Sequence, residues 1–148
     1  MRLSRLRSTA GFSLVEMLIV VAVIGLMMLL AWPRITAIYD RSQVRGARNV
    51  VINKFNTARI QARQSGMTTR FQQNGNLVWV ERDNGLGGWV TVGGVQNMNA
   101  VYGVTIPDVN MLTIDPRGLA QGTPITIRMG RAGIRDSVVF SGYGGISR

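Results

Sequence analysis

The sequence contains no cysteine and no histidine, and it has a single lysine against 16 arginines. Without cysteine, the chain forms no disulfide and offers no thiolate for a zinc site or for nucleophilic attack. Without histidine, it cannot build a Ser-His-Asp triad or any other histidine-dependent site. Enzyme classes that depend on either residue are therefore excluded. The lack of cysteine does not fix the compartment, because an exported protein can do without disulfides.

Acidic residues are also scarce, with seven Asp and Glu against 17 Lys and Arg, for a net charge of +10. Only Glu81 and Asp83 lie close together, and on a strand they would share a face. Such a pair could serve acid-base chemistry or a metal, but "ERDNG" is more simply a charged strand end that enters a turn. We expect no enzymatic activity, no metal and no cofactor. The many arginines fit either anion binding or the codon usage of a GC-rich genome.

The chain has one long apolar run, from Phe12 to Trp32, which as a helix would be about 31 Å long and would span a bilayer. Before it stands "MRLSRLRSTAG", which is basic and has no acid. The run is too long for an ordinary cleaved signal, so it predicts a retained single-pass membrane anchor. The basic end should stay in the cytoplasm and the C-terminal domain should lie outside it.

An acid inside this run needs an explanation. Placing the carboxylate of Glu16 in a membrane helix costs about 2.5–3.5 kcal/mol on insertion scales, and the run offers no partner cation. Cleavage between Gly11 and Phe12 would create one, because the new α-amino group would lie four residues before Glu16. Neighbouring copies could also make this contact if their helices stack with a stagger. The alternative is an anchor that carries an accidental acid.

The stretch "GFSLVE" resembles the type III signal of type IV pilins and type II secretion pseudopilins. The resemblance implies that a prepilin peptidase cuts after Gly11 and methylates the amine of Phe12. It also implies that Glu16 pairs with the amine of an adjacent subunit during filament assembly. Pro33 should kink or locally melt the helix, as a proline near this point does in pilins. Residues 1–11 are then a leader peptide, and 12–33 form the transmembrane and assembly half of a long helix.

The second half of this helix, residues 34–66, is expected to be amphipathic. One stripe of apolar side chains should face the globular domain, namely Val44, Ala47, Val51, Phe55, Ala58 and Ala62. A second stripe, within about 60° on the helical wheel, is an arginine ridge of Arg34, Arg41, Arg45, Arg48, Arg59 and Arg63. The ridge could be a solvated face, a contact for acidic faces of neighbouring subunits, or a site for lipid headgroups or nucleic-acid phosphates. Gly66 suits the helix end.

Residues 67–148 show about seven short β-type runs separated by Gly, Asn and Pro, including a hairpin at Asn74-Gly75 and a run over "AVYGVTI". We therefore predict an α+β fold, in which a long N-terminal helix packs on C-terminal antiparallel sheets. The expected core residues of this β-rich domain are Trp79, Trp89, Val92, Ile106, Leu112, Ile114, Ile125, Ile127, Val139 and Phe140.

Several short motifs resemble the GspH/FimT family of minor pseudopilins and minor pilins. An "AR..A...G" helix end is matched at Ala58 to Gly66, a "GW.V" strand starts at Gly88, "IDPRG" runs from Ile114 to Gly118, and "G..R" from Gly145 to Arg148. The resemblance implies a minor pseudopilin of a type II secretion system, a structural subunit at or near the tip of the pseudopilus that supports protein export. Its partners would be prepilin peptidase, other pilins or pseudopilins, and the inner membrane.

The alternative function is a minor type IV pilin that binds DNA for uptake or supports pilus assembly. Loss of the leader would leave 14 basic residues against seven acids, a net charge of +7. DNA-capturing members of this family use a C-terminal "GR.R"-like patch, and "GRAGIR" comes near that pattern with two extra residues of spacing. The candidate DNA- or anion-binding residues are Arg128, Arg131, Arg135 and Arg148. Phosphate contacts would make such binding strongly salt-dependent.

Overall fold

The structure is a computed structural model that describes residues 12–122, 124–143 and 145–147. The chain divides into two compact units, which meet in sequence between Ala37 and Ile38. Helix α1 (Leu14–Ser65) begins in the first unit and continues into the second. The expected leader, residues 1–11, lies outside the described residues.

In the first unit, the apolar side chains of α1 are exposed, for example Leu18 at 62% and Leu29 at 74%. Within the described part of the chain, α1 is the one helix long and apolar enough to cross a membrane, judged by length and composition. Pro33 lies inside the helix and has no backbone N–H to donate. The hydroxyl of Thr36 donates a hydrogen bond to the carbonyl of Pro33 at 3.0 Å.

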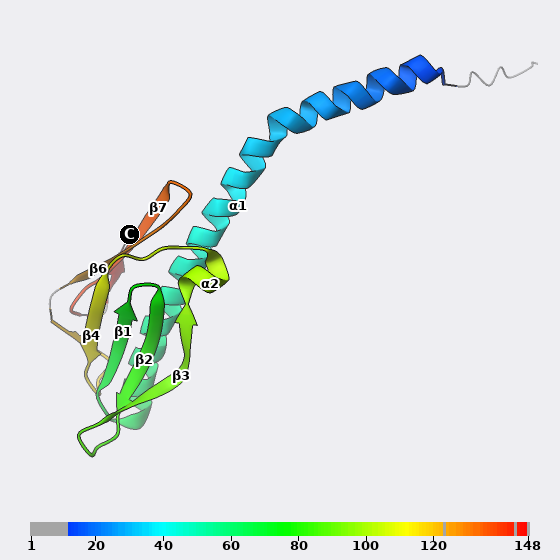
Figure 1. Ribbon diagram of the computed structural model, residues 1–148. Helices are drawn as coiled ribbons and strands as arrows, with labels where there is room; N and C mark the ends of the chain where they lie inside the picture. Colours follow the sequence, from blue (N-terminus) through cyan, green and yellow to red (C-terminus); the bar gives the residue numbers. More distant parts are fainter. Residues whose placement is uncertain (1–11, 123, 144, 148) are drawn as a thin grey trace, which may run out of the picture. The chain divides into compact units, whose positions relative to one another are not determined.

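In the second unit, the rest of α1 packs against two antiparallel sheets (Figure 1). The larger sheet has the strand order β3-β2-β1-β4-β5, and the smaller has the order β6-β7-β8. The strands are β1 (Thr69–Asn74), β2 (Leu77–Asp83), β3 (Trp89–Asn97), β4 (Val109–Ile114), β5 (Ala120–Gln121), β6 (Ile125–Arg131), β7 (Ile134–Phe140) and β8 (Ile146–Ser147). A long helix followed by antiparallel sheets confirms the predicted α+β fold.

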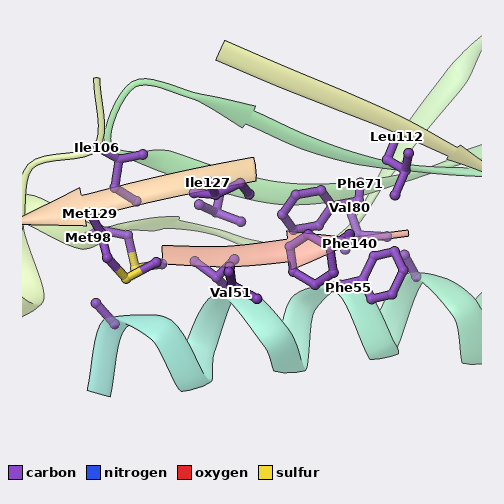
Figure 2. Close-up of a cluster of buried hydrophobic side chains, with 14 of the residues drawn as sticks. Val51, Phe55, Phe71, Val80, Met98, Ile106, Leu112, Ile127, Met129 and Phe140 are labelled. Atoms are coloured by element: carbon purple, nitrogen blue, oxygen red, sulfur yellow. The ribbon is translucent and has the colours of Figure 1, made fainter. Parts of the chain in front are cut away.

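The apolar stripe of α1 forms one wall of the core, and all six residues of the predicted stripe are buried. Figure 2 shows Val51 and Phe55 of α1 facing side chains of both sheets. The centroid of the Phe55 ring lies 4.4 Å from the centroid of the Phe140 ring. It lies 6.1 Å from the centroid of the Phe71 ring, which it meets edge to face. Ring pairs at such distances add to the free energy of burial. The long helix and the two sheets thus share one core.

Three of the ten expected core residues of the β-rich domain are wrong. Ile106, Leu112, Ile114, Ile127 and Phe140 are buried, and Val92 and Ile125 are partly buried and pack against the core. Trp79, Trp89 and Val139 are partly buried but lie on the outer faces of the sheets. The reason is strand alternation, because neighbouring residues point to opposite faces of a sheet. Val78 and Val80 take the inner face of β2, so Trp79 lies on the outer face, where its indole N–H donates to Glu81 at 2.9 Å. The guanidinium of Arg70 lies 3.5 Å from the ring centroid of Trp89.

The run "AVYGVTI" is not a strand, because helix α2 (Met98–Tyr102) occupies its first part. The side chain of Asn97 caps this helix by accepting hydrogen bonds from the N–H groups of Asn99 and Ala100. Gly103 ends the helix in the left-handed conformation, with φ of 61°. Two local caps therefore override the β propensity of the valines.

The predicted hairpin exists, but its turn lies one residue later than expected. Asn74 pairs with Leu77 as the last pair of β1 and β2, so Gly75 and Asn76 form the two-residue loop. Gly75 has a φ of 55°, and glycine at the first loop position is typical of the type II′ hairpin turn.

Candidate functional site

The N-terminal end of α1 holds the predicted processing and assembly residues. Gly11 lies outside the described residues, whereas Phe12 is 74% exposed and Glu16 is exposed in the first turn of the helix. The hydroxyl of Ser13 accepts a hydrogen bond from the N–H of Val15 at 3.2 Å. Ser13 thus acts as a helix cap, and Glu16 stands three residues later, where a negative charge favours the positive end of the helix dipole. A local reason for an acid here therefore exists, independent of the expected role in assembly.

The arginine ridge does not behave as one surface. Nη1 of Arg48 pairs with Oδ2 of Asp136 at 2.9 Å, and Nε of Arg59 donates to the carbonyl of Gly118 at 2.9 Å. Arg41 and Arg45 are exposed, as is Arg63, and Arg34 belongs to the first unit. Part of the ridge therefore ties α1 to the sheets, and part of it faces solvent.

Two of the short sequence motifs meet at one contact. Gly118 stands in the "IDPRG" turn, where Oδ1 of Asp115 accepts from the N–H groups of Arg117 and Leu119 at 2.9 and 2.8 Å. Arg59, from the "AR..A...G" helix end, donates to this turn at Gly118. A Cβ atom at Gly118 would lie 3.1 Å from the Cγ and Cδ atoms of Arg63, and the φ of Gly118 is 83°. Both features favour glycine here. The motif residues therefore hold the helix end against the turn.

The four predicted DNA- or anion-binding arginines do not form one patch. Arg128 and Arg135 are exposed on the outer face of the β6–β7 hairpin, since their cross-strand partners are Ser137 and Gly130. Arg131 is on the opposite face, because its Nε donates to Oδ1 of Asp40 at 2.7 Å and its Nη1 donates to the carbonyl of Tyr102. Arg148 lies outside the described residues. Strand alternation, which puts the tryptophans on the outer sheet face, also puts Arg131 on the face opposite to Arg128 and Arg135.

A different group of arginines comes together beside α1. An open pocket of about 560 Å³ is lined by Arg41, Val44, Arg45, Arg48, Ile134, Arg135 and Asp136. We call it the arginine pocket. Sequence reasoning placed Arg41, Arg45 and Arg48 on one helix face but did not bring Arg135 to them. Nothing in the sequence shows that the β6–β7 hairpin lies over this turn of the helix.

The carboxylates of the "ERDNG" stretch have structural partners. Oε1 of Glu81 accepts from Trp79, and Oε2 accepts from Nε2 of Gln72 at 2.7 Å. Oδ1 of Asp83 accepts from the N–H of Gly85 at 2.8 Å. These acids stabilise the outer sheet face and its turn, as the simpler interpretation of the stretch expected.

Comparison with known proteins bears on both ends of the chain. Residues 6–32 match the family described as the prokaryotic N-terminal methylation motif. The fold is similar to the crystal structure of the type IV minor pilin FimU from Pseudomonas aeruginosa PAO1, with a TM-score of 0.58 and 16% sequence identity. The similarity covers 72% of this chain and 88% of the FimU chain. No curated protein sequence matches the chain.

The matched motif includes the stretch "GFSLVE", on which the pilin resemblance rests. The apolar helix that begins within the motif is consistent with membrane anchoring. The chain therefore combines a prokaryotic N-terminal methylation motif with a fold similar to that of a type IV minor pilin.

Proposed function

We propose that this chain is a non-enzymatic minor subunit of a type IV pilin-like filament. The subunit is anchored in the inner membrane before it enters the filament. The observation that carries the proposal is the methylation motif at residues 6–32, which includes the exposed apolar start of helix α1. Such a helix needs either lipid or the helices of neighbouring subunits around it. Prepilin peptidase and other pilins are the partners that follow. The N-terminus faces the cytoplasm and the second unit lies outside it.

The first test concerns processing. When the chain is co-expressed with a prepilin peptidase, mass spectrometry should find a mature protein that begins at Phe12 and carries one methyl group. Gly11→Glu should leave the leader in place, because the peptidase must accept the residue before the cut. A Gly25→Ala control, in the same helix and with no atom within 4 Å of the added Cβ, should be processed normally. An unprocessed wild-type chain would contradict the proposal.

Two machines fit such a subunit. The GspH/FimT resemblance supports a pseudopilin at or near the tip of a type II secretion pseudopilus, and this is our first assignment. The similarity in fold to a type IV minor pilin supports the second candidate, a type IV pilus subunit. A deletion strain separates the two. Loss of an exported enzyme from the medium with normal surface pili supports secretion, and loss of pili with normal export supports the pilus.

DNA capture is a further role that the second candidate would allow. Arg128 and Arg135 share the exposed outer face of the β6–β7 hairpin, on a chain whose mature charge would be +7. Labelled duplex DNA should be titrated against the chain at several salt concentrations, together with Arg128→Ala/Arg135→Ala. Binding that falls steeply with salt and is lost in the variant supports capture. Absence of binding at low salt would rule it out.

A further inference from the structure

The arginine pocket has a strong local excess of positive charge. Four arginines line it, namely Arg41, Arg45 and Arg48 of α1 and Arg135 of β7, and Asp136 supplies its one carboxylate. Both oxygens of Asp136 are already used, because Oδ2 pairs with Arg48 at 2.9 Å and Oδ1 accepts from the N–H of Ser137 at 2.8 Å. Among the described residues, the other three arginines take part in no ion pair.

The arginines of the pocket differ in exposure. Arg48 is held at the wall, with its side chain 13% exposed, whereas Arg41, Arg45 and Arg135 are exposed. Val44, which is buried, and Ile134, which is partly buried, complete the lining. Charges near a protein surface interact more strongly than charges fully surrounded by water. A volume of about 560 Å³ also lies within the range of small-ligand sites.

We propose that the arginine pocket binds a phosphoryl group that carries two negative charges. Guanidinium forks suit both carboxylate and phosphate, but three uncompensated cations match a dianion better than a single carboxylate. A phosphomonoester carries about 1.5 to 2 negative charges at neutral pH and presents three acceptor oxygens. A nucleic-acid phosphodiester brings one charge per phosphate. The group could come from a free phosphate compound or from a lipid headgroup, and this site does not depend on the filament role.

The test uses the full chain in a neutral detergent, titrated with inorganic phosphate and pyrophosphate by calorimetry. The variant is Arg45→Ala/Arg135→Ala. The matched control is Arg63→Ala/Arg117→Ala, which removes the same charge from exposed residues that do not line the pocket. We expect the variant to lose at least about tenfold in affinity for pyrophosphate, which corresponds to about 1.4 kcal/mol. The control should change the affinity by no more than about twofold, because distant exposed charges are screened.

Arg45→Lys/Arg135→Lys keeps the charge but lacks the fork, so it should give an intermediate affinity. This variant also keeps the test valid if the alanine variant is unstable. An equal loss in the variant and the control would mean a bulk charge effect and would overturn the proposal. So would no binding of phosphate or pyrophosphate by the wild type, or binding of duplex DNA alone.

Nanodiscs separate the two sources of the ligand. The chain is placed in phosphatidylcholine discs that contain either phosphatidic acid, a phosphomonoester lipid, or an equal charge of phosphatidylglycerol, a phosphodiester lipid. If the headgroup is the ligand, pyrophosphate should bind more weakly in the phosphatidic acid discs than in the phosphatidylglycerol discs. If a free phosphate compound is the ligand, the affinities in the two discs should be equal.

Discussion

At Glu16, a carboxylate stands in the first turn of an apolar helix, exposed and next to the serine cap at Ser13. Removing the charge should ease insertion of this segment into a bilayer by about 2.5–3.5 kcal/mol. A variant that fails to assemble would therefore not fail for lack of membrane insertion. A substitution of Glu16 can therefore test filament assembly without impairing membrane anchoring.

We predict that Glu16→Ala is inserted and cleaved after Gly11 but is not incorporated into filaments. The physical reason is the lost partner for the α-amino group of Phe12 on a neighbouring subunit. Incorporation is measured by immunoblotting of sheared filaments, and Glu81→Ala, in the outer sheet face, is the control that should be incorporated. If Glu16→Ala is recovered in filaments at the wild-type level, Glu16 serves the helix terminus alone.

Phe55 is one of the side chains through which α1 contacts both sheets, since its ring packs on Phe71 and on Phe140. Phe55 is fully buried. Phe55→Ala should lower the free energy of unfolding by about 3–5 kcal/mol, as truncation of buried aromatic residues does. Ile60→Ala, on an exposed side of the same helix, should lower it by less than about 0.5 kcal/mol. Urea unfolding followed by near-ultraviolet circular dichroism measures both, and similar losses would show that Phe55 is not central to the core.

At the scale of elements, two ion pairs join α1 to the β6–β7 hairpin. Arg131 of β6 pairs with Asp40 at 2.7 Å, and Asp136 of β7 pairs with Arg48 at 2.9 Å. Arg131 also lies over the ring of Tyr39, with 5.5 Å between the guanidinium carbon and the ring centroid. These contacts use side chains that would otherwise be available to an anion.

We predict that Asp40 and Arg131 are energetically coupled. The side chains are 18% and 27% exposed, so the pair is partly shielded from solvent. A double-mutant cycle of Asp40→Ala, Arg131→Ala and the double variant should give a coupling energy of about 1 kcal/mol. The longer pair of Arg128 and Asp108, 3.9 Å apart and with Arg128 71% exposed, is the internal control and should give a coupling near zero. Strictly additive losses at Asp40 and Arg131 would rule out a stabilising pair.

At the scale of the whole molecule, the core lies within the second unit. Its buried residues run from Val44 to Phe140, and none of the described residues of the first unit, 12–37, belongs to it. The exposed apolar surface, in contrast, is concentrated in the first half of α1. The chain therefore combines a segment that requires an apolar environment with a unit that has its own core.

We predict that a chain shortened to begin at Arg34 is soluble without detergent and unfolds cooperatively, because every buried core residue is retained. Sedimentation should show a monomer, and urea should produce a single transition by circular dichroism and by fluorescence. The same shortened chain with Phe55→Ala is the comparison, and it should unfold at a lower urea concentration because its core is weakened. Aggregation of the unmodified shortened chain would mean that the first unit contributes to the stability of the second.

Some features of this protein follow from local sequence. The apolar stripe from Val44 to Ala62 could be predicted because a helix repeats about every 3.6 residues. Its position depends on this period and not on how the sheets are arranged. The anchor, the methylation motif and the α+β class are also local, since they depend on run length, spacing and turn residues. The turn at Gly75 and the α2 helix at Met98 escaped prediction because a one-residue shift or a single asparagine cap decides them.

Other features exist only in the tertiary structure. Strand register decided that Val78 faces inward and Trp79 outward, and a one-residue difference in register exchanges the two faces. Packing of the β6–β7 hairpin on α1 brought Arg131 to Asp40 and Arg135 to Arg45, across about 90 residues of sequence. Charge composition by itself determined that many cations lack an acidic partner, because 17 Lys and Arg face only seven Asp and Glu. Which cations are neutralised, and which line a pocket, was decided by the fold, because electrostatic interactions depend on distance in space.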